Sequence, residues 1–291
     1  MSLPSILILQ HEFDSPFDES IYIASRLKQS WEQSGHLVKI IRGVSEGISA
    51  DVLFTHIDAT TVGEEYLEYM DRFPVVINGK VTDISKDRFS TIMLQRTDSY
   101  RGPVIVKTKA NYGGHQDLNL LRRAGMRPLE RDLHERPWRK VETLDPYDYP
   151  VFDSINAVPL GVWKNPRLIV EKIVSEKTEN GHYVMRNWFF LGGQGFTRSV
   201  SSPYHIVKPA GQETIPGRET YLHRLDEPVH PAMQSLRENM GFDYGRFDYV
   251  MVDDEPVVFD VNTTPVIMGE GLQLHSKEIR EDLPRGLFSF L

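Results

Sequence analysis

The chain has 291 residues, of which 40% are hydrophobic and 25% charged, and it contains no cysteine. This composition indicates a folded globular protein of about two domains, and it excludes disulfide frameworks, thiolate nucleophiles and cysteine-based metal sites. Lys and Arg number 33 against 41 Asp and Glu, so a formal charge of −8 provides no general attraction to nucleic acid or anionic membranes. No apolar run approaches about 18 residues, so we expect a cytoplasmic protein with neither a membrane nor a nucleic-acid partner.

The first 79 residues alternate between predicted strands and helices, which is typical of an open parallel sheet. Apolar residues recur at three- and four-residue spacing from Ile21 to Trp31 and predict a helix, and a second helix is expected over 64–70. Short apolar runs predict strands at 6–9, 37–41, 52–55 and 75–77. We therefore expect a Rossmann-like α/β domain over 1–79, with His11, Glu12 and Asp14 beyond the carboxyl end of its first strand.

Residues 80–167 show a different pattern and are expected to form a second, smaller subdomain. The spacing predicts helices over 86–94 and 118–124, and a strand over 104–107 that runs into a loop containing Gly113 and Gly114. Residues 127–166 are mixed, polar and rich in proline, and we interpret them as an irregular insertion.

Residues 168–291 favour antiparallel pairing, so we expect an α+β subdomain. Gly181 and the pair Gly192-Gly193 are typical of hairpin turns. Strands are expected over 168–174, 183–191, 194–200, 246–252 and 257–262, with a helix over 231–240.

The last predicted hairpin carries a candidate metal site. Side chains alternate along a strand, so Asp260 shares a face with Asn262, and Arg246 shares a face with Asp248. A turn centred on Asp254 would place Asp248 opposite Asp260 and gather two carboxylates and an amide oxygen, which are ligands suited to Mg²⁺. The alternative interpretation is a structural ion pair between Arg246 and Asp260.

Four further residues are candidates for a functional site, and each of them also has a structural interpretation. Lys107 ends an apolar strand beside a glycine-containing loop, which suits either a phosphate contact or a solvated lysine. Lys86 by itself is typical of a surface charge, and Arg186 of packing over neighbouring aromatic residues. Glu171 lies in an apolar strand, where a carboxylate needs a partner.

The order of these elements resembles the ATP-grasp superfamily over roughly residues 75–270. The matching segments are 78–80 with 85–87, 104–107 with its Gly-Gly loop, 169–172, 185–190 and 241–265. The last is the most specific, because the family ends its nucleotide site with an acidic residue, a turn and an acid-x-Asn-x-x-Pro sequence. The resemblance implies an ATP-grasp fold preceded by the family's N-terminal domain, with Thr108 and Asp260 standing where Pro and Glu are usual.

The resemblance also implies a nucleotide site. In this site Lys86 and Lys107 contact the ATP phosphates under a closing loop. Glu171 and the backbone that follows it bind adenine. Arg186 stabilises the transferring phosphoryl group or the acyl phosphate. The implied contacts to ATP are Lys86, Lys107, Asn111, Gly113, Gly114, Glu171, Lys172, Ile173, Val174 and Arg186. The implied ligands of Mg²⁺, with Mn²⁺ as an alternative, are Asp248, Asp260 and Asn262, while Arg246 joins Lys107 and Arg186 as a catalytic candidate and Arg198 is a weaker one.

The resulting hypothesis is an ADP-forming ligase that joins a small-molecule or peptide carboxylate to an amine, with ATP as cofactor and a homodimer as the candidate assembly. A small-molecule kinase of the same fold is one alternative. The loop from Gln10 to Pro16 is acidic, which favours an amine substrate over a polyphosphorylated sugar. A non-catalytic nucleotide-binding regulatory protein is the other alternative.

Overall fold

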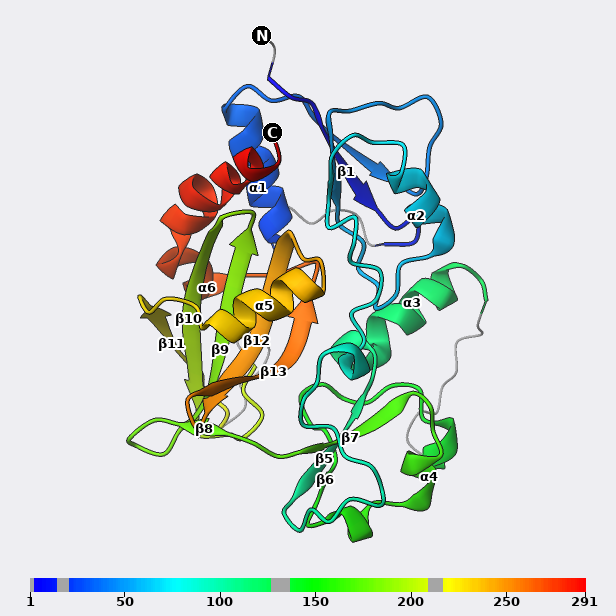
Figure 1. Ribbon diagram of the computed structural model, residues 1–291, viewed down its shortest axis with the longest axis vertical. Coiled ribbons are helices and arrows are strands. Elements are labelled where there is room, and N and C mark those ends of the chain that lie inside the picture. Colours follow the sequence, from blue (N-terminus) through cyan, green and yellow to red (C-terminus); the bar gives the residue numbers. More distant parts are fainter. Residues whose placement is uncertain (1–2, 15–20, 127–136, 209–216) are drawn as a thin grey trace.

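The computed structural model describes residues 3–14, 21–126, 137–208 and 217–291. In these ranges it contains a four-stranded, a six-stranded and a three-stranded sheet. Figure 1 shows the four-stranded sheet beside the C-terminal helical segment, and the three-stranded sheet at the opposite end of the molecule. The mixed α/β and α+β class predicted from the sequence is confirmed.

The N-terminal domain is the expected parallel sheet. Its strands follow the order β2-β1-β3-β4, and all of its pairs are parallel. Buried apolar residues fill β1, because both faces of a parallel sheet are covered. Its elements are β1 (Ile6–Gln10), α1 (Ile23–Gln33), β2 (Val38–Arg42), β3 (Val52–Thr55), α2 (Glu64–Met70) and β4 (Val76–Ile77).

The second subdomain is built on the three-stranded sheet, in which β5 is central and pairs antiparallel with β6 and β7. The boundary that we expected at 167/168 therefore passes through this sheet. The described part of the 127–166 insertion packs Trp138, Val141, Leu144 and Phe152 against Val104 and Val106, so it completes the core of this subdomain. The elements are β5 (Val104–Thr108), α3 (His115–Arg123), β6 (Val151–Phe152), α4 (Leu160–Trp163) and β7 (Leu168–Lys172).

The helix predicted over 86–94 is wrong beyond its first turn. Only Lys86–Arg88 is helical, as a short 3-10 turn. The chain then runs alongside β7, where Leu94 N–H donates to the Val170 carbonyl and Met93 bridges Glu171. Pairing with a strand edge thus overrides a local spacing that suited a helix.

The large sheet holds its strands in the order β11-β10-β9-β12-β13, with β8 paired to β9. The β12–β13 hairpin turns at Asp253 and Asp254, which both have positive φ. Helix α5 covers one face of this sheet, where Met233 packs with Trp188 and Phe247 (Figure 1). The elements are β8 (Glu176–Lys177), β9 (Tyr183–Leu191), β10 (Gln194–Ser202), β11 (Tyr221–Leu225), α5 (Pro231–Asn239), β12 (Tyr244–Val252) and β13 (Glu255–Asn262).

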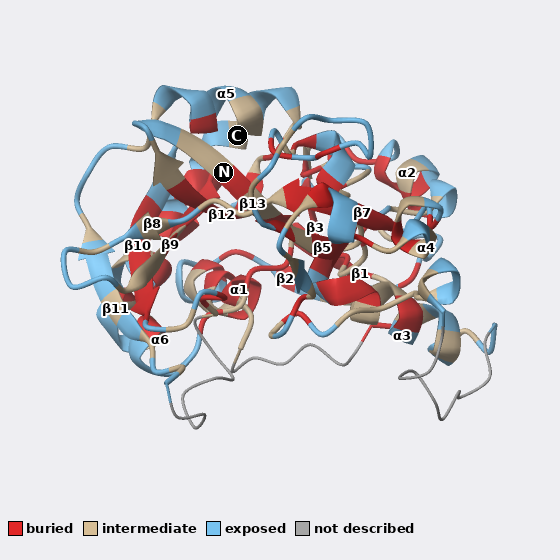
Figure 2. Ribbon diagram, turned by 90° about the horizontal axis from the view of Figure 1, so that it is seen from below, coloured by how far each residue is buried: buried red, intermediate tan, exposed pale blue. Residues whose placement is uncertain are grey.

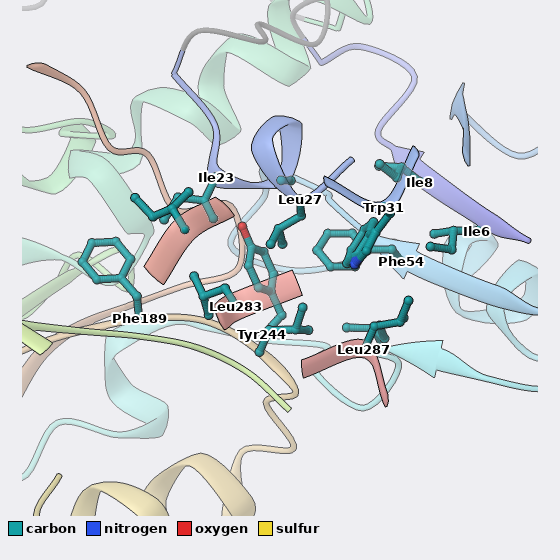
Figure 3. Packing of buried hydrophobic residues seen from close by; sticks show 14 of the residues in the cluster. Ile6, Ile8, Ile23, Leu27, Trp31, Phe54, Phe189, Tyr244, Leu283 and Leu287 are labelled. Atoms are coloured by element: carbon teal, nitrogen blue, oxygen red, sulfur yellow. The ribbon is translucent and has the colours of Figure 1, made fainter. Parts of the chain in front are cut away.

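The C-terminal segment joins the large sheet to the N-terminal domain. It contains α6 (Gly269–Leu274), a π-helical turn (Glu278–Asp282) and a 3-10 segment (Leu283–Phe290). Trp31 Nε1 donates to the Pro284 carbonyl at 3.0 Å. Figure 3 shows Leu283 and Leu287 beside Tyr244 of the large sheet and Trp31 and Phe54 of the N-terminal domain. The two units therefore share one hydrophobic core.

The distribution of buried residues agrees with this arrangement of sheets and helices. Figure 2 shows buried residues concentrated in the strands of the sheets, while α5 and α2 present exposed faces to solvent. Among the residues that the structure describes, no helix combines the length and the apolar composition that a membrane span requires.

Candidate nucleotide site

A row of polar side chains crosses the large sheet, with one residue from each of five adjacent strands. The register pairs Asp260 with Asp248, Asp248 with Asn187, Asn187 with Arg198, and Arg198 with Arg224. Directly paired residues on adjacent strands point to the same face, so these five side chains form one line. This line, called the polar row below, changes from carboxylates at the β13 end to guanidinium groups at the β11 end.

Asp248 is the most constrained member of the polar row. Its Oδ1 accepts from Asn187 Nδ2 at 2.8 Å and lies 2.8 Å from Arg246 Nε, and its Oδ2 accepts from Arg246 at 2.9 Å. The sequence prediction that Asp248 lies opposite Asp260 is confirmed by the strand register. The alternative pair of Arg246 with Asp260 is not found, because Arg246 binds Asp248 instead.

Two lysines from the smaller subdomain and its entry segment face the carboxylates. Lys86 Nζ lies 3.2 Å from Asp260 Oδ1 and donates to the Ala110 carbonyl at 3.2 Å. Lys107 Nζ lies 2.8 Å from Glu171 Oε2 and 4.8 Å from the centre of the Phe259 ring. Both lysines are buried, at 2% and 8% exposure, so neither is an ordinary solvated surface charge.

These lysines line a cavity of about 850 Å³, open side included, between the three-stranded sheet and the large sheet. The cavity joins charged groups, including Lys86, Lys107, Asp248 and Asp260, to an apolar wall. A combination of apolar wall and convergent charge suits a ligand with a flat base and a charged tail. The apolar wall includes Ile105, Val174, Met185, Ile206, Val250 and Phe259.

Lys208 also lines this cavity, although the sequence analysis did not identify it as a candidate site residue. Its signal was present, because Ile206-Val207-Lys208 ends an apolar run in lysine as Val104–Lys107 does. Burial lowers the pKa of Lys208, with Asp260 and Asp248 opposing that effect. The part of the chain that the structure describes contains no salt-bridge partner for Lys208, so the cavity holds positive charge that an anionic ligand would neutralise.

Arg198 is a second buried cation without a salt-bridge partner among the described residues, and it lies on the sheet face that carries Asp248. It is 3% exposed, and its Nε donates to Asn187 Oδ1 at 3.0 Å. Burial, with a contribution from nearby Arg246, lowers the pKa of Arg198 to about 10. Two guanidinium groups close together in a buried site repel each other, and a bound phosphate or carboxylate would relieve that repulsion.

In the segment expected to bind adenine, the first two N–H groups after Glu171 are occupied and, among the described residues, the third is not. Lys172 N–H donates to the Ile92 carbonyl at 3.0 Å, and Ile173 N–H donates to the Pro103 carbonyl at 3.2 Å. The Val174 N–H has no hydrogen-bond partner among the described residues, and Val174 lines the cavity. The backbone groups expected to complete the adenine edge are the Lys172 carbonyl and the Val174 N–H; this N–H is available, and both residues line the cavity.

Glu171, which the resemblance implied as an adenine contact, is paired with residues of its own subdomain. It is 1% exposed, with Oε2 on Lys107 and Oε1 accepting from Ser90 Oγ at 2.6 Å. Both oxygens are occupied inside the subdomain, and Glu171 is not part of the cavity wall. The structure thus supplies the partner that its apolar strand required, and the carboxylate orients Lys107.

The residues of the glycine loop predicted to contact ATP, Asn111, Gly113 and Gly114, do not line the cavity. Asn111 N–H donates to Thr60 Oγ1 at 3.0 Å, and the Gly113 carbonyl accepts from Leu144 N–H at 3.0 Å. Gly113 and Gly114 both have positive φ, and a Cβ on Gly113 would collide with the Leu144 carbonyl. The structure therefore explains these glycines by backbone geometry and close packing.

Arg186 lies on the opposite face of the large sheet from Asp248. It pairs across the strands with Tyr249, binds Glu176 at 2.7 Å and lies 3.1 Å from Glu227. These carboxylates hold its charge and raise its pKa. The neighbouring residue, Asn187, shares a face with Asp248, and Arg186 does not line the cavity that contains Asp248.

The predicted metal ligands fit Mg²⁺ by their chemistry. Asp248 and Asp260 are direct cross-strand partners, and alternation places Asn262 on the same face. Three hard oxygen donors with room for phosphate oxygens are suited to Mg²⁺. Within the described ranges no cluster of three His, Cys, Asp or Glu side chains occurs, so the amide of Asn262 and a bound phosphate would have to complete the coordination.

No family model matches the sequence, and no curated protein matches it either. Solved structures do match the fold. An ATP-grasp ligase from Chryseobacterium gregarium, described as RiPP-associated and in complex with ADP and a leader and core peptide, has a TM-score of 0.56 at 10% identity. The match covers 98% of this chain and 96% of that one.

Two further structures cover nearly the whole of both chains. The macrocyclase MdnC from Microcystis aeruginosa, bound with precursor peptide MdnA, has a TM-score of 0.52 at 9% identity and covers 98% of each chain. The D-alanyl-alanine synthetase A from Vibrio cholerae has a TM-score of 0.51 at 11% identity and covers 100% and 99%. This chain therefore has the ATP-grasp fold that the sequence motifs predicted.

Proposed function

We propose that this chain is an ATP- and Mg²⁺-dependent, ADP-forming ligase that joins a carboxylate to an amine. The observation that carries the proposal is the convergence of Lys86, Lys107 and Lys208 on one cavity that also contains Asp248 and Asp260. Buried lysines opposite oxygen donors form a site for a polyphosphate with its divalent ion. The ATP-grasp fold and the ligases that share it support the choice of reaction.

The lysines would bind the phosphates and offset their charge as the γ-phosphoryl group moves. In the first step, an oxygen of the substrate carboxylate attacks the γ-phosphorus, the bond to the β-phosphate oxygen breaks, and ADP leaves. Arg246 binds Asp248 and Arg198 binds the neighbouring Asn187, and these two guanidinium groups would stabilise the charge of the acyl phosphate. Mg²⁺ held by Asp248, Asp260 and Asn262 would supply charge neutralisation at the phosphates.

In the second step, the amine nitrogen attacks the carbonyl carbon, the bond from carbon to the phosphate oxygen breaks, and phosphate leaves with the amine losing a proton. No side-chain nucleophile is needed, which agrees with the absence of cysteine. The protein would act by orientation, charge neutralisation and exclusion of water. Amino acids and short peptides are the proposed substrate class, because the second substrate must present an amine.

The test is an incubation with ATP, Mg²⁺ and pooled amino acids or short peptides, followed by measurement of ADP and phosphate. With ¹⁸O in the substrate carboxylate, the ligase transfers one labelled oxygen to the released phosphate. Unlabelled phosphate, or a product phosphorylated on a hydroxyl, would exclude the acyl phosphate and favour the kinase. Absence of ADP with every pool, together with tight ATP binding, would favour a regulatory nucleotide-binding protein.

A further inference from the structure

We propose that Asn187 is a positioning residue that fixes the metal-binding carboxylate Asp248 and the guanidinium of Arg198 in one geometry. The inference rests on the proposed function, because it assigns Asp248 to Mg²⁺ and Arg198 to the phosphoryl group. Asn187 is fully buried at the centre of the polar row. Its Oδ1 accepts from Arg198 Nε at 3.0 Å, and its Nδ2 donates to Asp248 Oδ1 at 2.8 Å.

An amide is the side chain that these two neighbours require. A guanidinium group has only donors and an ionised carboxylate has only acceptors, so a residue between them must accept on one side and donate on the other. This requirement also fixes the orientation of the amide, with the oxygen toward Arg198. Aspartate here would repel Asp248, and an apolar residue would leave a buried donor and a buried acceptor without partners.

The amide also keeps Arg198 apart from Asp248. Among the described residues Arg198 has no salt-bridge partner, and its guanidinium carbon lies 5.3 Å from the centre of the Phe189 ring. Arg246 occupies both oxygens of Asp248. A direct pair of Arg198 with Asp248 would neutralise a charge that the phosphoryl group needs, so the amide spacer leaves that charge available while holding its position.

The sequence marks Asn187 as unusual for its place. It follows Arg186 in a strand whose next four residues, Trp188 to Leu191, are apolar and buried. A buried Asn in the middle of a strand is disfavoured unless its hydrogen bonds are satisfied. Within the described ranges, the side chain of Asn187 bonds only to the side chains of Asp248 and Arg198, which are both functional candidates. The buried Asn165 differs, because its Nδ2 donates to the backbone carbonyls of Trp138 and Val141.

The experiment measures ATP binding by calorimetry over a series of Mg²⁺ concentrations and in excess chelator, for the wild type, Asn187→Leu and Asn187→Thr. Threonine suits a strand and is too short to bridge Asp248 and Arg198, so it serves if the leucine variant does not fold. We expect the Mg²⁺ concentration for half-maximal enhancement to rise at least about tenfold, as for other residues that orient metal ligands. Affinity for ATP in chelator should stay within about twofold, because the lysines are unchanged.

Thr197→Val is the matched control, because Thr197 is a buried polar residue of β10 that lines a cavity with Arg186, on the face away from Asp248. It should bind ATP like the wild type at every Mg²⁺ concentration. In an Asp248→Asn background, Asn187→Leu should add little further change, because Asn187 acts through Asp248.

The outcomes separate the two proposals. If the wild type shows Mg²⁺-enhanced ATP binding and the folded variants match it, the role of Asn187 is wrong while the proposed function stands. Equal loss of ATP affinity with and without Mg²⁺ in the variants would also overturn it, since that result indicates general damage to the site. If ATP binding by the wild type does not respond to Mg²⁺, the proposed function fails and the inference fails with it.

Discussion

Lys86 and Asp260 are 174 residues apart in the chain, yet Lys86 Nζ lies 3.2 Å from Asp260 Oδ1. Lys86 lies in the segment that leads to β5, and Asp260 belongs to the last strand of the large sheet, so the pair joins two sides of the cavity. Both side chains are largely buried, which strengthens their attraction. The proposed function assigns Lys86 to phosphate and Asp260 to Mg²⁺, so this pair must exchange partners when both bind.

Asp260→Ala should therefore reduce ADP formation by more than about 100-fold, because it removes a metal ligand and leaves Lys86 without its carboxylate. The fold should survive, since Asp260 lies at the cavity and outside the hydrophobic core. Steady-state ADP release and circular dichroism check the two parts. Glu255→Gln, an exposed residue at the start of β13, is the control and should retain turnover. Undiminished turnover of the alanine variant would contradict the metal assignment.

Glu171→Gln should destabilise the protein by about 3 kcal/mol, because it leaves the buried Lys107 ammonium without its carboxylate. Urea unfolding measures this change. The exposed i,i+4 pair of Lys28 and Glu32 provides the comparison, and Glu32→Gln should change stability by less than about 0.5 kcal/mol. Similar values for both variants would show that Glu171 does not hold Lys107. A loss of adenine specificity with unchanged stability would instead favour the role implied by the resemblance.

Gly271→Ala should impair turnover more than stability. A Cβ at this helical position would collide with Nη1 of Arg198, and the end of that flexible side chain would move before the backbone does. We expect at least a tenfold fall in the rate of ADP formation with little change in ATP affinity or thermal midpoint, because only the guanidinium is displaced. Gly193→Ala meets no atom closer than 3.6 Å and should behave like the wild type. A crystal structure of Gly271→Ala with Arg198 unmoved would contradict this explanation.

The sequence favours Arg186 as the catalytic arginine, whereas the tertiary structure favours Arg198, and substitution of each tests which is right. Arg186→Met should reduce ADP formation by less than about threefold, because its carboxylate partners and its face of the sheet lie away from the cavity. Arg198→Met should reduce it more than about 100-fold, as expected when a preorganised charge at the reacting group is removed. The reverse order in the same turnover assay would restore Arg186 as the catalytic candidate and remove Arg198.

Asp14 should make stability depend on pH. Burial, and the nearby Asp58 carboxylate, raise the pKa of Asp14 to about 7. Between about pH 4 and pH 7 the unfolded chain has lost this proton while the folded chain keeps it, so stability falls as the pH rises through that window. Asp14→Asn removes the effect, and its advantage over the wild type in urea unfolding should grow from pH 5 to pH 8. A difference that is constant over this range would show that Asp14 titrates normally.

The sequence predicted the parts of the fold that depend on nearby residues. The strand β3 and the helix α2 match their predicted bounds, because hydrophobic periodicity reports which side of an element is buried. The opposition of Asp248 and Asp260 was predicted from a turn centred on Asp254, but the turn pairs Val252 with Glu255, and a β-bulge next to Asp248 is what brings Asp260 opposite it. The order of motifs predicted the ATP-grasp fold.

Contacts between segments that are far apart in the chain could not be predicted from the sequence. Alternation shows that Arg186 and Asn187 point to opposite faces, but it does not say which face α5 covers and which borders the cavity. Glu171 needed a partner, and the sequence did not reveal that Lys107 and Ser90 would supply it. Residues 90–94 have a spacing that suits a helix, but in the structure they form hydrogen bonds with the edge of β7.

The sequence by itself determined most of the elements and the chemical types of the candidate ligands, because periodicity and turns are local properties of the chain, and its motif order resembled the ATP-grasp fold. Only the tertiary structure decided which charges meet: Lys107 with Glu171, Lys86 with Asp260, and Asn187 between Asp248 and Arg198. The physical reason is that an ionic or amide side chain acquires its role from the donors and acceptors within hydrogen-bond distance. Those neighbours come from strands brought together by sheet pairing and by packing of the shared core.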